Sequence, residues 1–150
     1  MRNSYNRRKI CQEPNTKDHG PDPFIVDINW LAKKNSYFRT TLWTGENLQV
    51  TLMCIPVGGD IGLEKHHVDQ YIRIESGCGI AMMGYSEENL SYRKIVCDNY
   101  VIFVPAGTWH NIKNTGNCPL KLSSLYAPPQ HPPGTLHETK ADSDADEHHY

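Results

Sequence analysis

The sequence of 150 residues lacks a long apolar run, and this absence excludes one large class of protein. No stretch approaches the roughly 18–20 apolar residues that a membrane-spanning helix needs. The opening residues, MRNSYNRRKI, also lack the apolar segment of a secretory signal. We therefore expect no membrane partner and a cytoplasmic location. A chain of this length is expected to form one domain, because it can bury about two thirds of its unfolded surface around one core.

An excess of charge of one sign is also missing, since the net charge is -2 at pH 7. Basic residues gather between residues 1 and 17, whereas residues 141–147, ADSDADE, carry four acids and no base. A basic segment without interleaved aromatic residues is typical of a solvated tail rather than of a nucleic-acid interface. We therefore expect a flexible basic arm over residues 1–20, a folded domain over 21–140, a disordered acidic tail over 141–150, and no nucleic-acid partner.

The cysteines lack the spacing of a thiolate site. Five are scattered through the chain without any C-x-x-C pair: Cys11, Cys54, Cys78, Cys97 and Cys118. An odd and scattered set fits neither a disulfide framework nor a zinc site built from thiolates. We therefore expect all five to be reduced, with Cys54 in an apolar strand and Cys78 in a glycine-rich turn.

Apolar residues at helical spacing are scarce, whereas short runs that alternate apolar and polar residues are common. This period of two predicts strands, which we expect at residues 38–43, 48–56, 68–75, 80–83, 91–97, 100–104, 109–113 and 120–126. About eight short strands joined by turns suggest a β-sandwich or barrel. The four prolines of residues 127–134, APPQHPPG, predict an extended strap over the surface.

Two separated segments carry side chains that could bind a metal. In the first, Glu64, His66 and Gln70 stand at even spacings, so an extended strand would direct them to one face. In the second, a tight turn at Pro105 precedes His110, which begins a strand that could place its imidazole opposite the first set. Two imidazoles with one or two oxygen donors suit a divalent first-row metal. We therefore expect Glu64, His66, Gln70 and His110 to be metal ligands.

These segments resemble the two motifs of the cupin superfamily. The first motif, G-x5-H-x-H-x3,4-E-x6-G, is similar to Gly58-x5-Glu64-x-His66-x3-Gln70-x6-Gly77. The second, G-x5-P-x-G-x2-H-x3-N, is similar to Asn99-x5-Pro105-x-Gly107-x2-His110-x3-Asn114. The resemblance implies an all-β fold, the single-domain cupin, which is a jelly-roll barrel also described as a double-stranded β-helix. Runs such as IPVGGDIGLE and FVPAGTWHN look most like the small cupins labelled phosphomannose-isomerase-like.

Two ligand positions depart from the family pattern. Glu64 stands where the family has its first histidine, and Gln70 stands where it has glutamate. An amide oxygen is a weaker ligand than a carboxylate, and a buried amide can equally be satisfied by hydrogen bonds. The loop after the histidines is shorter than in relatives, which leaves open whether His66 or His67 is the ligand. The implied cofactor is one divalent transition metal, Zn, Mn, Fe or Ni.

A metal at the mouth of such a barrel predicts an enzyme that acts on a small polar molecule such as a sugar, a sugar phosphate or an oxo-acid. The chemistry would be isomerase-like, epimerase-like or that of an oxygenase. Glu64 could bind the metal or act as a general base, and His131 could contact the substrate if the strap crosses the mouth. The chain has no obvious cluster of arginine and lysine to hold a phosphate.

The competing hypothesis is a cupin that binds or senses a small molecule without turnover. Gln70 slightly favours this hypothesis, because it removes one candidate acid. By resemblance to single-domain cupins, we also expect a homodimer, formed through strand or sheet contacts of the N-terminal half.

Overall fold

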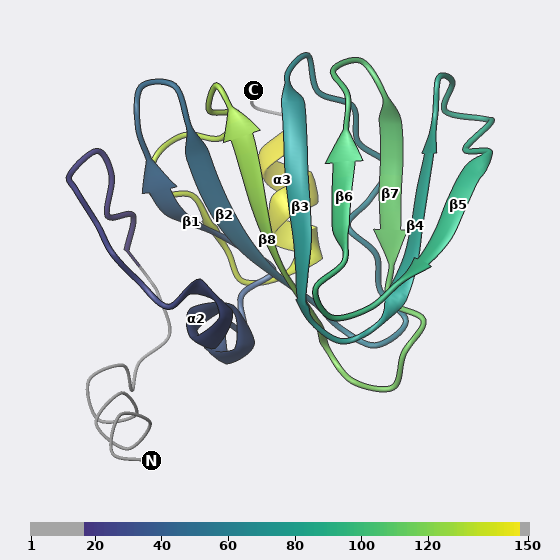
Figure 1. Ribbon diagram of the computed structural model, residues 1–150, viewed down its shortest axis with the longest axis horizontal. Helices are drawn as coiled ribbons and strands as arrows, with labels where there is room; N and C mark the ends of the chain where they lie inside the picture. The colour runs from purple at the N-terminus through teal and green to yellow at the C-terminus, as the bar shows by residue number, and fades with distance from the viewer. Residues whose placement is uncertain (1–16, 148–150) are drawn as a thin grey trace.

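The computed structural model describes residues 17–147, whose strands form two antiparallel sheets (Figure 1). The strands are β1 Arg39–Thr44, β2 Gln49–Ile55, β3 Asp69–Ser76, β4 Gly79–Gly84, β5 Tyr92–Val96, β6 Val101–Val104, β7 Trp109–Lys113, β8 Leu120–Ala127 and β9 Leu136–His137. The helices are α2 Ile28–Lys34 and α3 Lys140–Glu147. One sheet has the strand order β6-β3-β8-β2-β1-β9, and the other has the order β5-β4-β7. No helix in this part of the chain is long and apolar enough to span a membrane.

The all-β prediction is confirmed. Each of the eight expected strands is present, with ends within one residue of those expected. Both helices and the short strand β9 were not expected. The helix α2 has only seven residues, too few for an apolar period of 3.6 to be recognised in the sequence.

Strand β2 divides its side chains between two environments. Met53 and Ile55 belong to the core between the two sheets. Leu52 belongs to a second cluster, in which it packs against Leu31 and Ala32 of α2. The helix therefore covers the outer face of the six-stranded sheet, and the inner face of that sheet packs on the three-stranded sheet.

The expectation of a disordered tail is wrong for residues 141–147, which belong to the helix α3. The sequence offers no apolar anchor there, but the structure supplies polar ones. Lys140 pairs with Asp60 at 2.6 Å, and Asp146 pairs with His137 at 2.8 Å. Ser143 is buried and accepts a hydrogen bond. Residues 148–150 lie outside the described residues.

The expectation of a flexible basic arm is wrong at its last residues. Asp18 accepts hydrogen bonds from the amides of Gly20 and Thr44, each of 2.9 Å. These contacts fix the start of the described chain against β1, because a carboxylate that accepts several bonds orders the backbone around it. Residues 1–16 lie outside the described residues.

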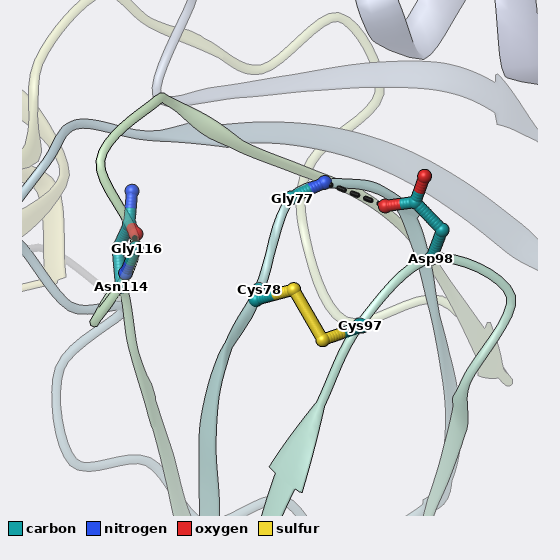
Figure 2. Close-up of a disulfide and its surroundings, with 6 residues drawn as sticks. All are labelled: Gly77, Cys78, Cys97, Asp98, Asn114 and Gly116. Atoms are coloured by element: carbon teal, nitrogen blue, oxygen red, sulfur yellow. Dashed lines mark hydrogen bonds between the residues drawn. A yellow bond between two sulfur atoms is a disulfide. The ribbon is translucent and has the colours of Figure 1, made fainter.

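The expectation that all cysteines are reduced is also wrong, because Cys78 and Cys97 form a disulfide (Figure 2). The strands β4 and β5 are antiparallel neighbours, and Gly79 pairs with Val96. The residues just beyond that pair therefore face each other, although 19 positions separate them in the sequence. Cys54, expected in an apolar strand, lies in β2 and is partly buried, and Cys118 is exposed. Both are free, and Cys11 lies outside the described residues.

The contact between α2 and the sheet can be tested with Leu52→Ala. Leu52 is fully buried, so the variant should lower the free energy of unfolding by about 2–5 kcal/mol, measured by urea denaturation. The matched control is Ile95→Ala, since Ile95 also lies in a strand but is 69% exposed. Equal losses in the two variants would contradict this packing.

Candidate metal centre

Backbone pairing places Glu64 and His110 opposite each other. The segment that leads to Glu64 runs antiparallel along the outer edge of β7, where the amide of Ile61 donates to the carbonyl oxygen of Ile112 at 3.0 Å. Glu64 and His110 then exchange two backbone hydrogen bonds, each of 2.9 Å. Residues paired in this way project their side chains from the same face, so the two sequence motifs meet here.

His66 completes a group of three side chains that could hold a metal ion. Its Nε2 lies 3.3 Å from Oε2 of Glu64, and Nε2 of His110 lies 3.8 Å from the same oxygen. The amide of Gly107 donates to the carbonyl oxygen of His66 at 2.8 Å and ties the two motifs together a second time. His67 is exposed and is not part of the group. Of the two histidines that the sequence leaves open, the structure therefore brings His66 close to Glu64 and His110.

The ring of His110 is oriented for metal binding. Its Nδ1 lies 3.0 Å from the carbonyl oxygen of Thr108. Because a carbonyl oxygen can only accept, Nδ1 carries the proton and Nε2 keeps its lone pair. Within residues 17–147, this buried Nε2 has no hydrogen-bond partner.

Gln70 is buried, and like His110 it carries an acceptor atom that receives no hydrogen bond from the described residues. Its Nε2 donates to the hydroxyl of Ser124 at 2.7 Å, whereas its Oε1 has no hydrogen-bond partner in the described part of the chain. Leaving a buried acceptor unpaired costs about 1–3 kcal/mol. The unpaired Nε2 of His110 lies 3.8 Å from Oε2 of Glu64, and together with that carboxylate and the imidazole of His66 it forms a donor set that fits a cation.

Arg39 is the site residue that the sequence analysis missed. It is the first residue of β1, it is 1% exposed, and its Nη2 donates to Oε1 of Glu64 at 2.9 Å. The strand pattern contains no sign that this arginine points inward, because alternation alone does not distinguish a buried polar position from a solvated one. The contact occupies one oxygen of Glu64 and leaves Oε2 facing the histidines.

The charges of the site are set by burial and by close partners. Burial alone would raise the pKa of Glu64, but the hydrogen bond with His66 and the charge of Arg39 outweigh it and hold this pKa at about 2. Burial lowers the pKa of His110, and it lowers that of His131, with the charge of Arg39, to about 3. Burial also raises the pKa of Tyr126 to about 12. Glu64 is therefore ionised at neutral pH, whereas these two histidines and the tyrosine are neutral.

The proline-rich strap borders the same site. Gln49 holds it, because Oε1 of Gln49 accepts from the amides of Gln130 and His131 and its Nε2 donates to the carbonyl oxygen of His131. The ring of His131 contacts Tyr126, whose ring in turn contacts His66. A pocket of about 580 Å³ lies between the strap and the first motif, lined by Leu63, Glu64, Lys65, His66, Pro129, Gln130, His131 and Pro132.

The ligand assignment predicts a difference between His110→Ala and Gln70→Ala. Imidazole is the stronger donor for transition metals, so His110→Ala should abolish zinc binding whereas Gln70→Ala should weaken it only about tenfold. Metal content by mass spectrometry and chelator competition measure the two effects, and His67→Ala serves as an exposed histidine control. Equal losses of zinc affinity in the Gln70 and His110 variants would show that the amide of Gln70 is a full ligand.

The pKa of His131 predicts how acid destabilises the protein. The unfolded chain has its usual histidine pKa of 6.5 and the folded state has about 3, so the unfolded state binds the proton first as the pH falls. Between pH 7 and 5, the metal-free protein should lose about 1–2 kcal/mol more unfolding free energy than His131→Gln. Urea denaturation across this range measures the difference, and parallel losses would contradict it.

The chain is similar over most of its length to two bacterial proteins. It is 56% identical over 148 residues to the uncharacterized protein YrkC of Bacillus subtilis, a match that covers 98% of this chain and 77% of that protein. The crystal structure of BH2720 from Bacillus halodurans shares 59% identity with a TM-score of 0.85, over 86% of this chain and 98% of that one.

More distant structures show the same fold. An RmlC-like cupin with a double-stranded β-helix from Methanocaldococcus jannaschii is 14% identical, with a TM-score of 0.56, over 73% of this chain and 92% of that one. The family model of the cupin domain matches residues 51–126, which contain both sequence motifs. The chain therefore belongs to the cupin domain family and has its double-stranded β-helix fold.

Proposed function

We propose that this protein is a metal-dependent enzyme that acts on a small polar molecule. The observation that carries the proposal is the meeting of Glu64, His66 and His110 beside a pocket of about 580 Å³. One carboxylate oxygen and two imidazole nitrogens, with Oε1 of Gln70 as a weaker donor, suit one divalent ion such as Zn, Mn, Fe or Ni. When bound, such an ion supplies Lewis-acid polarisation of a carbonyl or hydroxyl group.

Of the two roles that the sequence leaves open for Glu64, we propose that of metal ligand. A general base needs a pKa near the working pH, and the pKa of Glu64 is held at about 2. His131 is the proposed group that contacts the substrate, and because its pKa is held at about 3 it would do so as a neutral hydrogen-bond partner rather than by exchanging a proton. This role is supported by its position in the pocket lining and by its Nδ1, which is buried without a hydrogen-bond partner among the described residues.

The proposed substrate is a small sugar, sugar phosphate or oxo-acid. Among the described residues that line the pocket, Lys65 is the only lysine or arginine. A phosphate is usually held by several cationic donors. This composition gives little support to the phosphomannose-isomerase-like resemblance within the family.

The alternative function is a cupin that binds or senses a small molecule without turnover. One observation favours it: Glu64 is the only acid among the described residues that line the pocket, and it is already paired with Arg39. A site without a second carboxylate has fewer groups for acid and base catalysis.

A homodimer also remains part of the proposal. The strand β9 pairs with Arg39 and Thr40 and covers part of the edge of β1, so this edge is not fully open to a partner chain. The support now comes from apolar side chains beside that strand, since Ile25 is fully exposed and Phe24 is 37% exposed. Light scattering at several concentrations tests the assembly, and a 17.1 kDa species throughout would contradict it.

The function is tested by metal analysis of protein purified without an affinity tag, followed by a substrate screen with and without chelator. We expect about one divalent ion per chain and a turnover that the chelator abolishes. His131→Ala should retain the metal and lower turnover about tenfold, because the substrate would lose one hydrogen-bond partner in the pocket lining. Folded protein that takes up no metal would contradict the proposal, and metal-dependent binding without turnover would favour the sensing alternative.

A further inference from the structure

Arg39 places a permanent positive charge next to the proposed metal ligands. Its guanidinium donates from Nη2 to Oε1 of Glu64 at 2.9 Å and from Nη1 to the hydroxyl of Ser143 at 2.6 Å. Arginine remains protonated at any physiological pH. Ser143, in α3, is a neutral partner and is 2% exposed. The helix thus fixes the guanidinium in place through a contact that adds no charge.

The pair of Arg39 and Glu64 changes the charge balance of the centre. The carboxylate carries one negative charge, and the guanidinium at 2.9 Å offsets it. The other donors, His66, His110 and Gln70, bind a metal as neutral groups. These five residues together carry no net charge, so they leave the charge of a divalent ion uncompensated.

The described residues that line the pocket supply no further negative charge. Glu64 is the only acid among its described lining residues, and Lys65 adds a positive charge. Glu64 is also the only acid among the groups that most strongly shift the pKa values of Tyr126 and His131. Asp60 pairs with Lys140, and Asp146 of α3 lies 2.8 Å from Nε2 of His137; neither acid is among the described residues that line the pocket.

We propose that the pocket selects a small carboxylate anion of the oxo-acid class over a neutral sugar. This inference rests on the proposed metal centre and chooses one of its substrate classes. An anion supplies the missing negative charge in a partly buried site, where charges interact more strongly than in water. A carboxylate fits better than a phosphate, because Lys65 is the only cationic side chain in the described lining.

The ligand class is tested on the zinc-loaded and cobalt-loaded protein with two probes of similar size, pyruvate and neutral hydroxyacetone. Calorimetry with zinc and the visible spectrum of cobalt report binding without any need for turnover. Pyruvate should bind about tenfold or more tightly than hydroxyacetone. Equal affinities would overturn the proposal, and inorganic phosphate that binds as tightly as pyruvate would overturn the carboxylate class.

Substitution of Arg39 tests the cause of this selectivity. At saturating metal, Arg39→Met should weaken pyruvate binding about tenfold, whereas Arg39→Lys, which keeps the charge, should largely retain it. The matched control is Arg73→Met, because Arg73 pairs with buried Glu75 outside the pocket and should leave pyruvate affinity unchanged. Unchanged affinity in a metal-loaded Arg39→Met variant would overturn the role of Arg39.

The two levels of the proposal fail in different ways. Wild-type protein that binds neither zinc nor cobalt would contradict the metal centre itself. Wild-type protein that binds both ions but does not distinguish pyruvate from hydroxyacetone would contradict only the ligand class. If Arg39→Met does not fold, Lys65→Met removes the other positive charge. This variant should lose less pyruvate affinity than Arg39→Met would, and the loss should depend more strongly on salt. Unchanged pyruvate affinity in Lys65→Met would contradict the proposal.

Discussion

The backbone pairing of Glu64 with His110 is the constraint on which the site depends. Glu64 lies outside the named strands, and its position is fixed by two hydrogen bonds of 2.9 Å to the edge of β7. Side chains alternate along a paired segment, so a shift by one residue would turn Glu64 away and bring Lys65 inward. The ion pair of Glu64 with Arg39 and its contact with His66 both require this register.

The interior of the barrel is apolar in one part and polar in another. The shared core of the two sheets includes Ile72, Ile74 and Leu122. Elsewhere the same strands bury Gln70 and Ser124, which are hydrogen-bonded to each other. Burying such groups costs free energy unless hydrogen-bond partners are provided. Among the described residues, Oε1 of Gln70 and Nε2 of His110 are buried without such partners. The polar part of the interior is therefore the part suited to ligand binding.

The C-terminal third of the chain closes this polar region through side chains of the N-terminal half. Gln49 holds the strap through the backbone of Gln130 and His131. Arg39 holds α3 through Ser143. The helix has a strongly polar composition, so its order depends on these specific bonds rather than on an apolar face. The strap, which borders the pocket, is thus anchored to β2, and α3 is anchored to β1.

The sequence by itself determined the strands and three residues that could hold a metal. Alternation and turn residues are local signals, and they located eight strands to within one residue. Motif spacing likewise identified Glu64, His66 and His110, which the fold brings together. The family itself could be inferred from these fixed offsets.

Only the tertiary structure decided which distant residues meet. The pairing of Cys78 with Cys97 follows from the hairpin register of β4 and β5. The inward position of Arg39 and the order of α3 depend on each other through Ser143. Such contacts join residues far apart in the chain through a covalent bond or through hydrogen bonds between buried polar groups, and they leave no periodic pattern in the sequence from which they could be predicted.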